Sequence, residues 1–153
     1  FPSLSVEENL RMGGYTLSKG TLKQRMQAQY DGFPRLKERR RQRVKTMSGG
    51  ERQMLAMARA LMTEPDLLML DEPSAALSPQ MADEVFQKVQ SINAQGRTIL
   101  IVEQEAQHAL EISDRGYVLA DGRNAFDGKA RDILNDDKIR QAYLGGQVAE
   151  ADG

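Results

Sequence analysis

Two short stretches of this chain combine residue types that can do phosphate chemistry. The first, Met47-Ser48-Gly49-Gly50-Glu51, places a serine and two glycines at the start of a helical pattern that runs from Ser48 to Met62. Ser48 can cap that helix, and Glu51 can complete a capping box with it. Backbone N–H groups at a helix start form an anion site, and glycines let a phosphate approach closely. This stretch is therefore a candidate phosphate cradle.

The second stretch, Leu67-Leu68-Met69-Leu70-Asp71-Glu72-Pro73, is an apolar run that ends in two adjacent acids. The pattern predicts a buried strand that delivers these carboxylates to its carboxyl end, where α/β sheets place their ligands. Asp71 suits a Mg²⁺ shell, because Mg²⁺ prefers oxygen ligands and keeps several waters. Glu72 suits a base that activates a water. A phosphate cradle, a magnesium-binding acid and a base together predict nucleotide hydrolysis.

In this order and at this spacing, the two stretches resemble the ATP-binding subunits of ABC transporters. Met47 to Glu51 is similar to their signature loop, usually written LSGGQ, with Met for Leu and Glu for Gln. Leu67 to Glu72 resembles their Walker B strand with its catalytic glutamate. A capped core helix or an ordinary strand end would explain either half alone. The resemblance implies that the signature residues contact the ATP of an opposite subunit; these are Ser48, Gly49, Gly50 and Glu51.

Length and composition fit a globular domain. The 153 residues are enough to bury one core, and the net charge of −1 with 28% charged and 40% apolar residues is ordinary for such a chain. No run of about 18 apolar residues is present, so no membrane-spanning helix is expected. The absence of cysteine excludes disulfides and thiolate metal sites, and a single histidine argues against a histidine-based metal site.

No P-loop, G-x-x-x-x-G-K-[ST], occurs in the sequence, although such a loop would hold the nucleotide phosphates. The resemblance implies an α/β fold, the ABC-type P-loop NTPase fold, truncated to the last two thirds of an ATP-binding subunit. It assigns residues 1–46 to the ABC helical subdomain, 47–146 to the C-terminal part of the mainly parallel sheet core, and 147–153 to a frayed tail. We expect such a fragment to be inactive alone.

The first 46 residues are predicted to be mostly helical. Ser5-Val6-Glu7-Glu8 is a capping box that opens a short helix. A second helix is expected over Thr21 to Tyr30 and a third over Leu36 to Arg43. The strongly basic run from Arg35 to Lys45 is compatible with a nucleic-acid patch. Because no aromatic residue interleaves its arginines, a solvated face that attracts nucleotide beside the phosphate site is the favoured interpretation.

The remaining elements follow a strand–helix–strand pattern. A helix opened by Ser78 and Pro79 is predicted to reach Ala94 and to bury five apolar residues at 3.6 spacing: Ala82, Val85, Phe86, Val89 and Ile92. The continuous apolar run Thr98 to Val102 predicts a second strand buried on both faces, as in a parallel sheet. Asp121-Gly122 indicates a hairpin, with a turn a few residues longer than the tightest kind, and a last helix is expected through Tyr143.

Two further positions depart from the common ABC pattern. Most ABC ATPases carry a switch histidine where Gln104 stands, so the resemblance implies a catalytic role for Gln104, whose amide can donate to a phosphate oxygen but cannot carry positive charge. His108 is interpreted as a surface or packing residue rather than a substitute switch. Ser78 stands where the common D-loop pattern has an aspartate, which leaves a cross-subunit aspartate contact unsupported. Helix capping by Ser78 is compatible with a place in the D-loop and is the favoured role.

Several further stretches narrow the resemblance to the LivF-type ATPases of branched-chain amino acid importers: Phe33 to Leu36, Val102 to Gln104, Asp114 to Leu119 and Ala142 to Gly146. This branch implies ATP and Mg²⁺ as cofactors and a second ATPase subunit, LivG-like or identical, as partner. It also implies permease subunits, an indirect solute-binding protein, no nucleic acid, and the cytoplasmic face of the bacterial inner membrane. A urea or short-amide importer ATPase and a non-transport ABC-type ATPase acting on nucleic acid are the alternatives.

Overall fold

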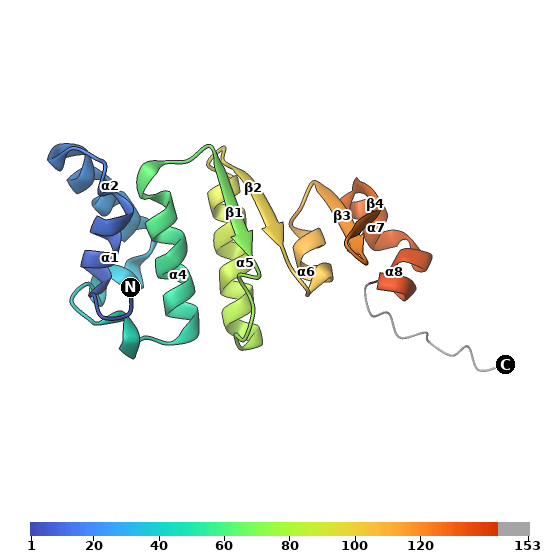
Figure 1. Ribbon diagram of the computed structural model, residues 1–153, viewed down its shortest axis with the longest axis horizontal. Helices are drawn as coiled ribbons and strands as arrows, with labels where there is room; N and C mark the ends of the chain where they lie inside the picture. Colours follow the sequence, from blue (N-terminus) through green and yellow to red (C-terminus); the bar gives the residue numbers. More distant parts are fainter. Residues whose placement is uncertain (144–153) are drawn as a thin grey trace. The chain divides into compact units, whose positions relative to one another are not determined.

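The computed structural model describes residues 1–143, and the chain divides into two compact units at residue 100. The expected helix end at Gly145-Gly146 and the tail 147–153 lie outside the described residues. No helix within the described part is long and apolar enough to cross a membrane. Figure 1 shows helices at the start of the first unit, followed by its strand–helix–strand segment.

Three helices make up the N-terminal lobe, residues 1–46. The helix α1 (Val6–Gly13) begins at the predicted capping box, in which Ser5 accepts from the Glu8 N–H and Glu8 accepts from the Ser5 N–H at 2.7 Å. The helix α2 (Lys19–Gly32) is longer than predicted, because Ser18 caps it by accepting from the Thr21 N–H. The helix α3 (Pro34–Glu38) is shorter than predicted, since the chain after Glu38 is held by contacts with α1.

A clasp of backbone hydrogen bonds closes the lobe. The amides of Val6 and Glu7, in the first turn of α1, donate to the carbonyl oxygens of Gln42 and Arg40 at 3.1 and 2.9 Å. In return the Val44 amide donates to the Leu4 carbonyl at 3.0 Å. These tertiary bonds satisfy helix-end donors that have no partner within α1, and they keep the segment 39–43 out of a helix.

The helix α4 (Gly49–Ala60) packs against α1, between the short 3₁₀ turns η1 (Val44–Thr46) and η2 (Leu61–Thr63). Leu10 of α1 and Met62 of η2 are fully buried. The end of α1 approaches α4 very closely, because a Cβ placed on Gly13 would lie only 2.4 Å from the Arg59 carbonyl oxygen. Glycine is therefore required at position 13 by the neighbouring backbone.

The second half of this unit consists of β1 (Leu67–Asp71), α5 (Pro79–Asn93) and the start of β2 (Thr98–Val102), a strand that continues past residue 100. The strands pair in a two-stranded sheet and run in the same direction, with α5 along one side (Figure 1). Ser78 caps α5, and all five apolar residues predicted to be buried are buried.

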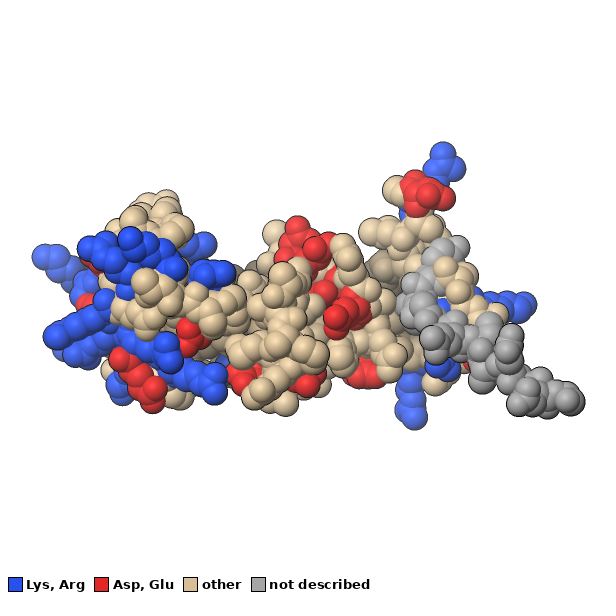
Figure 2. Space-filling model, turned by 90° about the horizontal axis from the view of Figure 1, so that it is seen from below, with Lys and Arg blue, Asp and Glu red and all other residues tan. Residues whose placement is uncertain are grey.

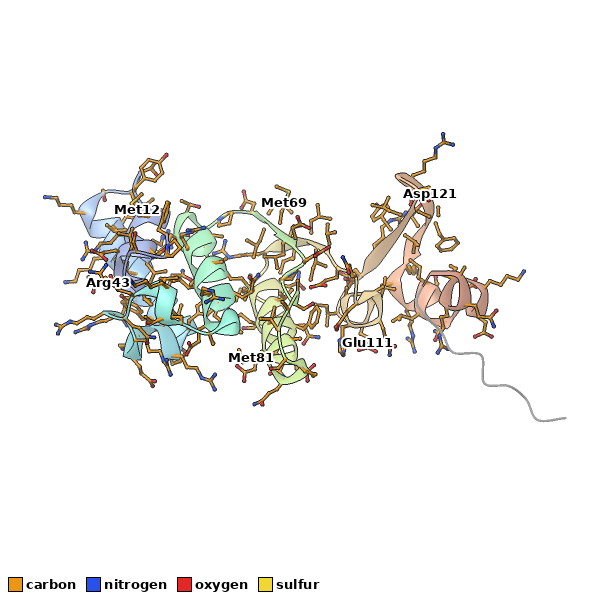
Figure 3. The ribbon with its side chains drawn as sticks, turned by 60° about the horizontal axis from the view of Figure 1, so that its bottom comes forward. Met12, Arg43, Met69, Met81, Glu111 and Asp121 are labelled. Carbon is orange, nitrogen blue, oxygen red and sulfur yellow. The ribbon has the colours of Figure 1, made fainter. Side chains whose placement is uncertain are left out.

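The prediction of a buried first strand holds for only one of its faces, and the prediction that β2 is buried on both faces is wrong for the described residues. Leu68 and Leu70 are buried, but Met69 is 69% exposed and points away from α5 (Figure 3). Leu67, Leu100 and Val102 are each about half exposed. We call these four side chains the open sheet face. An apolar strand is buried on both faces only when a layer covers each of them. The described residues cover one face of this sheet, so the other face is exposed.

The second unit contains α6 (Ala106–Glu111), β3 (Arg115–Ala120), β4 (Arg123–Lys129), α7 (Ala130–Asn135) and α8 (Asp137–Tyr143). The two strands form an antiparallel hairpin around a core of Leu110, Ala130, Ile133 and Ile139. Asp121 and Gly122 both have positive φ, so the hairpin has the tightest, two-residue turn and not the longer one predicted. The predicted last helix is two helices, because the Asp136 carboxylate accepts from the amides of Lys138 and Ile139 and starts α8 afresh.

Candidate nucleotide site

The start of α4 forms the predicted capping box. Ser48 accepts from the Glu51 N–H at 3.2 Å, and the Glu51 carboxylate accepts from the Ser48 N–H at 3.0 Å. These two bonds use the first and last of the four N–H groups at this helix end. Within the described residues, the amides of Gly49 and Gly50 have no acceptor. They are the donors that a helix start offers to an anion.

An arginine from the basic run holds the capping glutamate. Arg39 pairs with Glu51 at 3.1 Å, and the Glu51 side chain is only 13% exposed. Glu51 is therefore bound on both sides, by the Ser48 amide and by the Arg39 guanidinium. Such charge-assisted contacts fix a side chain more firmly than neutral hydrogen bonds do. In this chain Glu51 orders the loop around Ser48.

The two glycines lie against the segment that follows the acidic pair. A Cβ on Gly50 would meet the Met81 side chain at 2.1 Å, and one on Gly49 would meet Leu77 at 3.2 Å. Leu77 precedes α5 and Met81 belongs to its first turn. The start of α4 is thus packed beside the start of α5, and glycine makes that approach possible.

Asp71 and Glu72 end β1 with both residues exposed. Glu72 has a φ of +45°, in the left-handed region that a non-glycine residue seldom adopts. The next residue, Pro73, is fully buried, and the Glu72 carbonyl accepts from the Ala75 amide at 3.1 Å. The sharp turn is therefore anchored from behind. A backbone strained at a cost on the order of 1–3 kcal/mol persists only where its surroundings enforce it.

Figure 1 places the start of α4, the end of β1 and the start of α5 at the same edge of the first unit. The signature residues begin α4 and the acidic pair stands at the end of β1, so both belong to the element ends at this edge. Unbonded N–H donors at a helix start suit phosphate, and exposed carboxylates at a strand end suit a divalent cation.

Gln104 and His108 belong to the second unit, which is described on its own. Gln104 is exposed, two residues after the end of β2, and its carbonyl accepts from the Ala106 amide at 2.8 Å, at the start of α6. His108 is also exposed, and its Nδ1 lies 3.3 Å from the Glu105 carboxylate on the same helical turn. The expectation that His108 is a surface residue is confirmed.

The acidic pair fits a magnesium ion that shares its shell with a substrate. Among the described residues, no group of three or more histidine, aspartate or glutamate side chains could enclose a metal. Mg²⁺ is commonly held by one or two carboxylates together with waters and substrate phosphates, and needs no such enclosure. Asp71, exposed at the strand end, meets that requirement.

Sequence reasoning missed three residues that shape this site. Arg39 appeared only as one charge of a basic run, and its pairing with Glu51 depends on how the lobe folds back on α4. Leu77 and Met81 were not connected with the glycines, because their contacts join different elements. No signal in the sequence marks Arg39, because its proximity to Glu51 is visible only in the tertiary fold.

The fold and this edge define a nucleotide-binding cassette, and sequence comparison agrees. The profile of the ABC transporter family matches residues 1–75. The chain belongs to the family of ABC transporter ATP-binding proteins. It is 47% identical over 146 residues to the high-affinity branched-chain amino acid transport ATP-binding protein BraG of Pseudomonas aeruginosa. The matched region covers 95% of this chain and 63% of that protein. A probable branched-chain amino acid transport ATP-binding protein LivF of Archaeoglobus fulgidus is 46% identical, with 95% and 62% covered.

Solved structures share the fold. The ADP conformation of MJ1267, an ATP-binding cassette of an ABC transporter, superposes with a TM-score of 0.80 at 24% identity, covering 95% of this chain and 64% of that one. The structure of cbiO1 from Clostridium perfringens, part of the ABC transporter complex cbiONQ, gives a TM-score of 0.79 at 22% identity, with 91% of this chain and 56% of that one covered. The chain thus spans less than two thirds of the length of these relatives.

Proposed function

We propose that this chain is the signature and Walker B part of an ATP-binding subunit that powers branched-chain amino acid uptake by an ABC importer. The observation that carries the proposal is the shared edge, where the start of α4, with the unbonded amides of Gly49 and Gly50, packs against the segment that follows Asp71 and Glu72. The 46–47% identity to BraG and LivF supports the choice of solute. The place of action is the cytoplasmic face of the bacterial inner membrane.

The proposed roles follow the geometry of each residue. Ser48, Gly49 and Gly50 bind the phosphates of an ATP held by a second ATPase subunit, LivG-like or identical to this one. Glu51 positions that loop through the Ser48 amide. Asp71 would hold Mg²⁺, and the ion would neutralise phosphate charge when it is bound. Glu72, held in its strained turn, accepts the proton of the attacking water.

Gln104 takes a lesser role in this proposal. Its amide can donate one neutral hydrogen bond to phosphate, whereas charge-assisted bonds are roughly twice as strong. After hydrolysis, the helical lobe transmits the motion of the ATPase subunit to the permease subunits. A solute-binding protein delivers the amino acid to the permease subunits. No nucleic acid takes part.

A chimaera tests the proposal with a complete enzyme. Residues 1–143 replace the corresponding part of BraG, and the hybrid is assembled with the BraG importer's own subunits. We expect ATP-dependent leucine uptake. The variant Glu72→Gln should lower ATP turnover by about 100-fold or more, as for a lost general base. Gln104→Ala should lower it roughly tenfold, as for one neutral hydrogen bond.

Asp66→Asn is the matched control, because Asp66 is an exposed acid just before β1, at the opposite end of that strand from Asp71, and it should leave turnover unchanged. If Gln104→Ala is as inactive as Glu72→Gln, the ranking of the two residues is wrong. A hybrid that assembles and hydrolyses ATP with Glu72→Gln as fast as without it would overturn the assignment of the base.

The signature assignment has its own test in the same hybrid. Ser48→Arg should abolish turnover while the isolated subunit keeps its affinity for ATP, because Ser48 serves the nucleotide of the opposite subunit. A parallel loss of affinity in the isolated subunit would contradict binding in trans. The 153-residue chain alone should show no ATP turnover, since it contains no P-loop.

Solute choice is decided by transport. Uptake of radiolabelled leucine, isoleucine and valine by the assembled importer is compared with uptake of urea in the same vesicles. A urea importer ATPase is the alternative, and it would couple poorly to the BraG permease. Failure to support leucine uptake, with ATP turnover intact, would favour that alternative.

A further inference from the structure

The N-terminal lobe contains a pocket that the proposed ATPase chemistry does not use. It has a volume of about 450 Å³ and lies between α1, α2 and the segment that contains Arg40. One face of α2 supplies most of its wall, with lining residues at helical spacing from Lys19 to Tyr30. We call it the lobe pocket. Its size is within the range of small-molecule sites, about 300–1,000 Å³.

Positive charge dominates the lobe pocket. Its lining includes Arg11, Lys19, Lys23 and Arg40, with Glu7 as the single acid. Glu7 is already paired with Arg11 at 2.9 Å. Among the described residues, the side chains of Lys19, Lys23 and Arg40 have neither an ion pair nor a hydrogen bond. Figure 2 shows how strongly lysine and arginine gather over this lobe.

The lobe pocket also contains an unsatisfied donor. Tyr30 lines it, is only 8% exposed, and its hydroxyl has no hydrogen-bond partner within the described part of the chain. Buried tyrosine hydroxyls usually find a partner, because an unpaired one loses its hydration without compensation. The charges that act on this hydroxyl are those of Glu7, Arg40 and Arg11, which also line the pocket. A ligand oxygen would supply the missing acceptor.

Part of the wall is apolar. Met26 is buried and Leu22 is half-buried, and both lie on the pocket side of α2 with the two lysines. The volume exceeds what a bare inorganic ion needs, so the space beside the cations suits an attached organic group. Three unpaired cations and a hydroxyl donor favour a dianion over a single carboxylate, because each additional charge adds a charge-assisted contact.

We propose that the lobe pocket binds a phosphate ester, with the phosphate held by Lys19, Lys23, Arg40 and the Tyr30 hydroxyl, and the organic group against Leu22 and Met26. The same chemistry is presented by a soluble phosphate ester and by the headgroup of an acidic phospholipid. The proposal is independent of ATP hydrolysis, because none of these residues belongs to the shared edge of α4, β1 and α5.

The test uses the 153-residue chain with glycerol 3-phosphate as the soluble probe, titrated by calorimetry at constant ionic strength. Flotation with phosphatidic acid vesicles, against phosphatidylcholine vesicles, tests the lipid source. We expect Lys19→Glu with Lys23→Glu to weaken binding by more than tenfold and Tyr30→Phe to weaken it about tenfold. The matched control is Lys37→Glu with Lys45→Glu, which makes the same charge change on exposed residues of the lobe outside the pocket.

The proposal is supported, with a soluble phosphate ester as the ligand, if glycerol 3-phosphate binds and the variants weaken its affinity as expected. Binding of phosphatidic acid vesicles alone, with the same effects of the variants, supports it with a lipid headgroup. The proposal is overturned if neither probe binds, if the control pair weakens binding as much as the pocket pair, or if Tyr30→Phe binds as well as the original chain. Because Tyr30→Phe removes only an unpaired hydroxyl, its thermal unfolding should show an intact fold.

Discussion

The N-terminal lobe and the β1–β2 sheet lie in the same compact unit, yet they bury their apolar residues very differently. In the lobe, Leu10 and Leu36 are at most 2% exposed, because helices from both sides cover them. In the sheet, every second residue of β1 is exposed although the strand is almost wholly apolar. The lobe closes its core with its own helices. The sheet has one covered face and one open face, so part of its apolar surface stays exposed.

The largest expected difference between the two regions is the cost of removing a side chain. Leu10→Ala should lower the free energy of unfolding by about 3 kcal/mol, because it leaves a cavity between α1 and α4. Met69→Ala, on the open sheet face, should change it by less than about 0.5 kcal/mol. Urea unfolding followed by circular dichroism measures both. Equal losses would show that the open sheet face is covered in solution.

Backbone contact in the lobe gives the next largest effect. Gly13→Ala should destabilise the chain by about 1–2 kcal/mol, since the new methyl group meets the Arg59 carbonyl and the helices must separate. Gly20→Ala is the matched control, because a Cβ at position 20 of α2 meets nothing within 4 Å. It should stabilise the chain by up to about 1 kcal/mol through helix propensity. Thermal unfolding of the two variants should therefore shift in opposite directions.

Self-association should distinguish the two regions next. Exposed apolar side chains on a sheet favour contact with another copy, so the 153-residue chain should associate in a concentration-dependent way. Met69→Lys with Leu100→Lys should weaken that association about tenfold, or 1.4 kcal/mol. Met12→Lys changes an exposed residue of the lobe and should leave it unaltered. Sedimentation velocity at several concentrations decides, and a monomeric original chain would contradict the expectation.

The smallest effect concerns proton binding in the lobe. Burial raises the pKa of the Tyr30 phenol, and the Glu7 carboxylate adds to the rise. Above pH about 10, where an unfolded tyrosine loses its proton, the folded chain therefore holds more protons than the unfolded chain. Its free energy of unfolding should fall as the pH rises through this range. Unfolding at pH 9 and at pH 11 should show a smaller fall for Tyr30→Phe; an identical fall would exclude Tyr30 as its source.

Local pattern predicted what local contacts decide. The capping boxes at Ser5 and Ser48, and the buried side of α5, follow from spacing alone, because helix ends and helix faces are set within a few residues. The position of Asp71 and Glu72 at a strand end was equally readable, since an apolar run that stops at two acids has few alternatives.

What could not be predicted depends on distant partners. The helix α3 is short because the carbonyls of Arg40 and Gln42 accept hydrogen bonds from amides of α1. No residue within α3 indicates this contact. The open sheet face reads as buried in sequence, because composition does not say how many layers cover a strand. The positive φ of Glu72 is similarly hidden, since glutamate is not a residue that usually marks the left-handed region.

The clasp between the two ends of the lobe has a consequence for folding kinetics. Its bonds join Val6 to Gln42, Glu7 to Arg40 and Leu4 to Val44, so they form only after the intervening chain has returned. Closing this loop of roughly 40 residues costs conformational entropy before its hydrogen bonds form. The first turn of α1 should therefore form late in folding, although α1 itself is a local helix. In native-state hydrogen exchange, the amides of Val6, Glu7 and Val44 should open together as one cooperative unit.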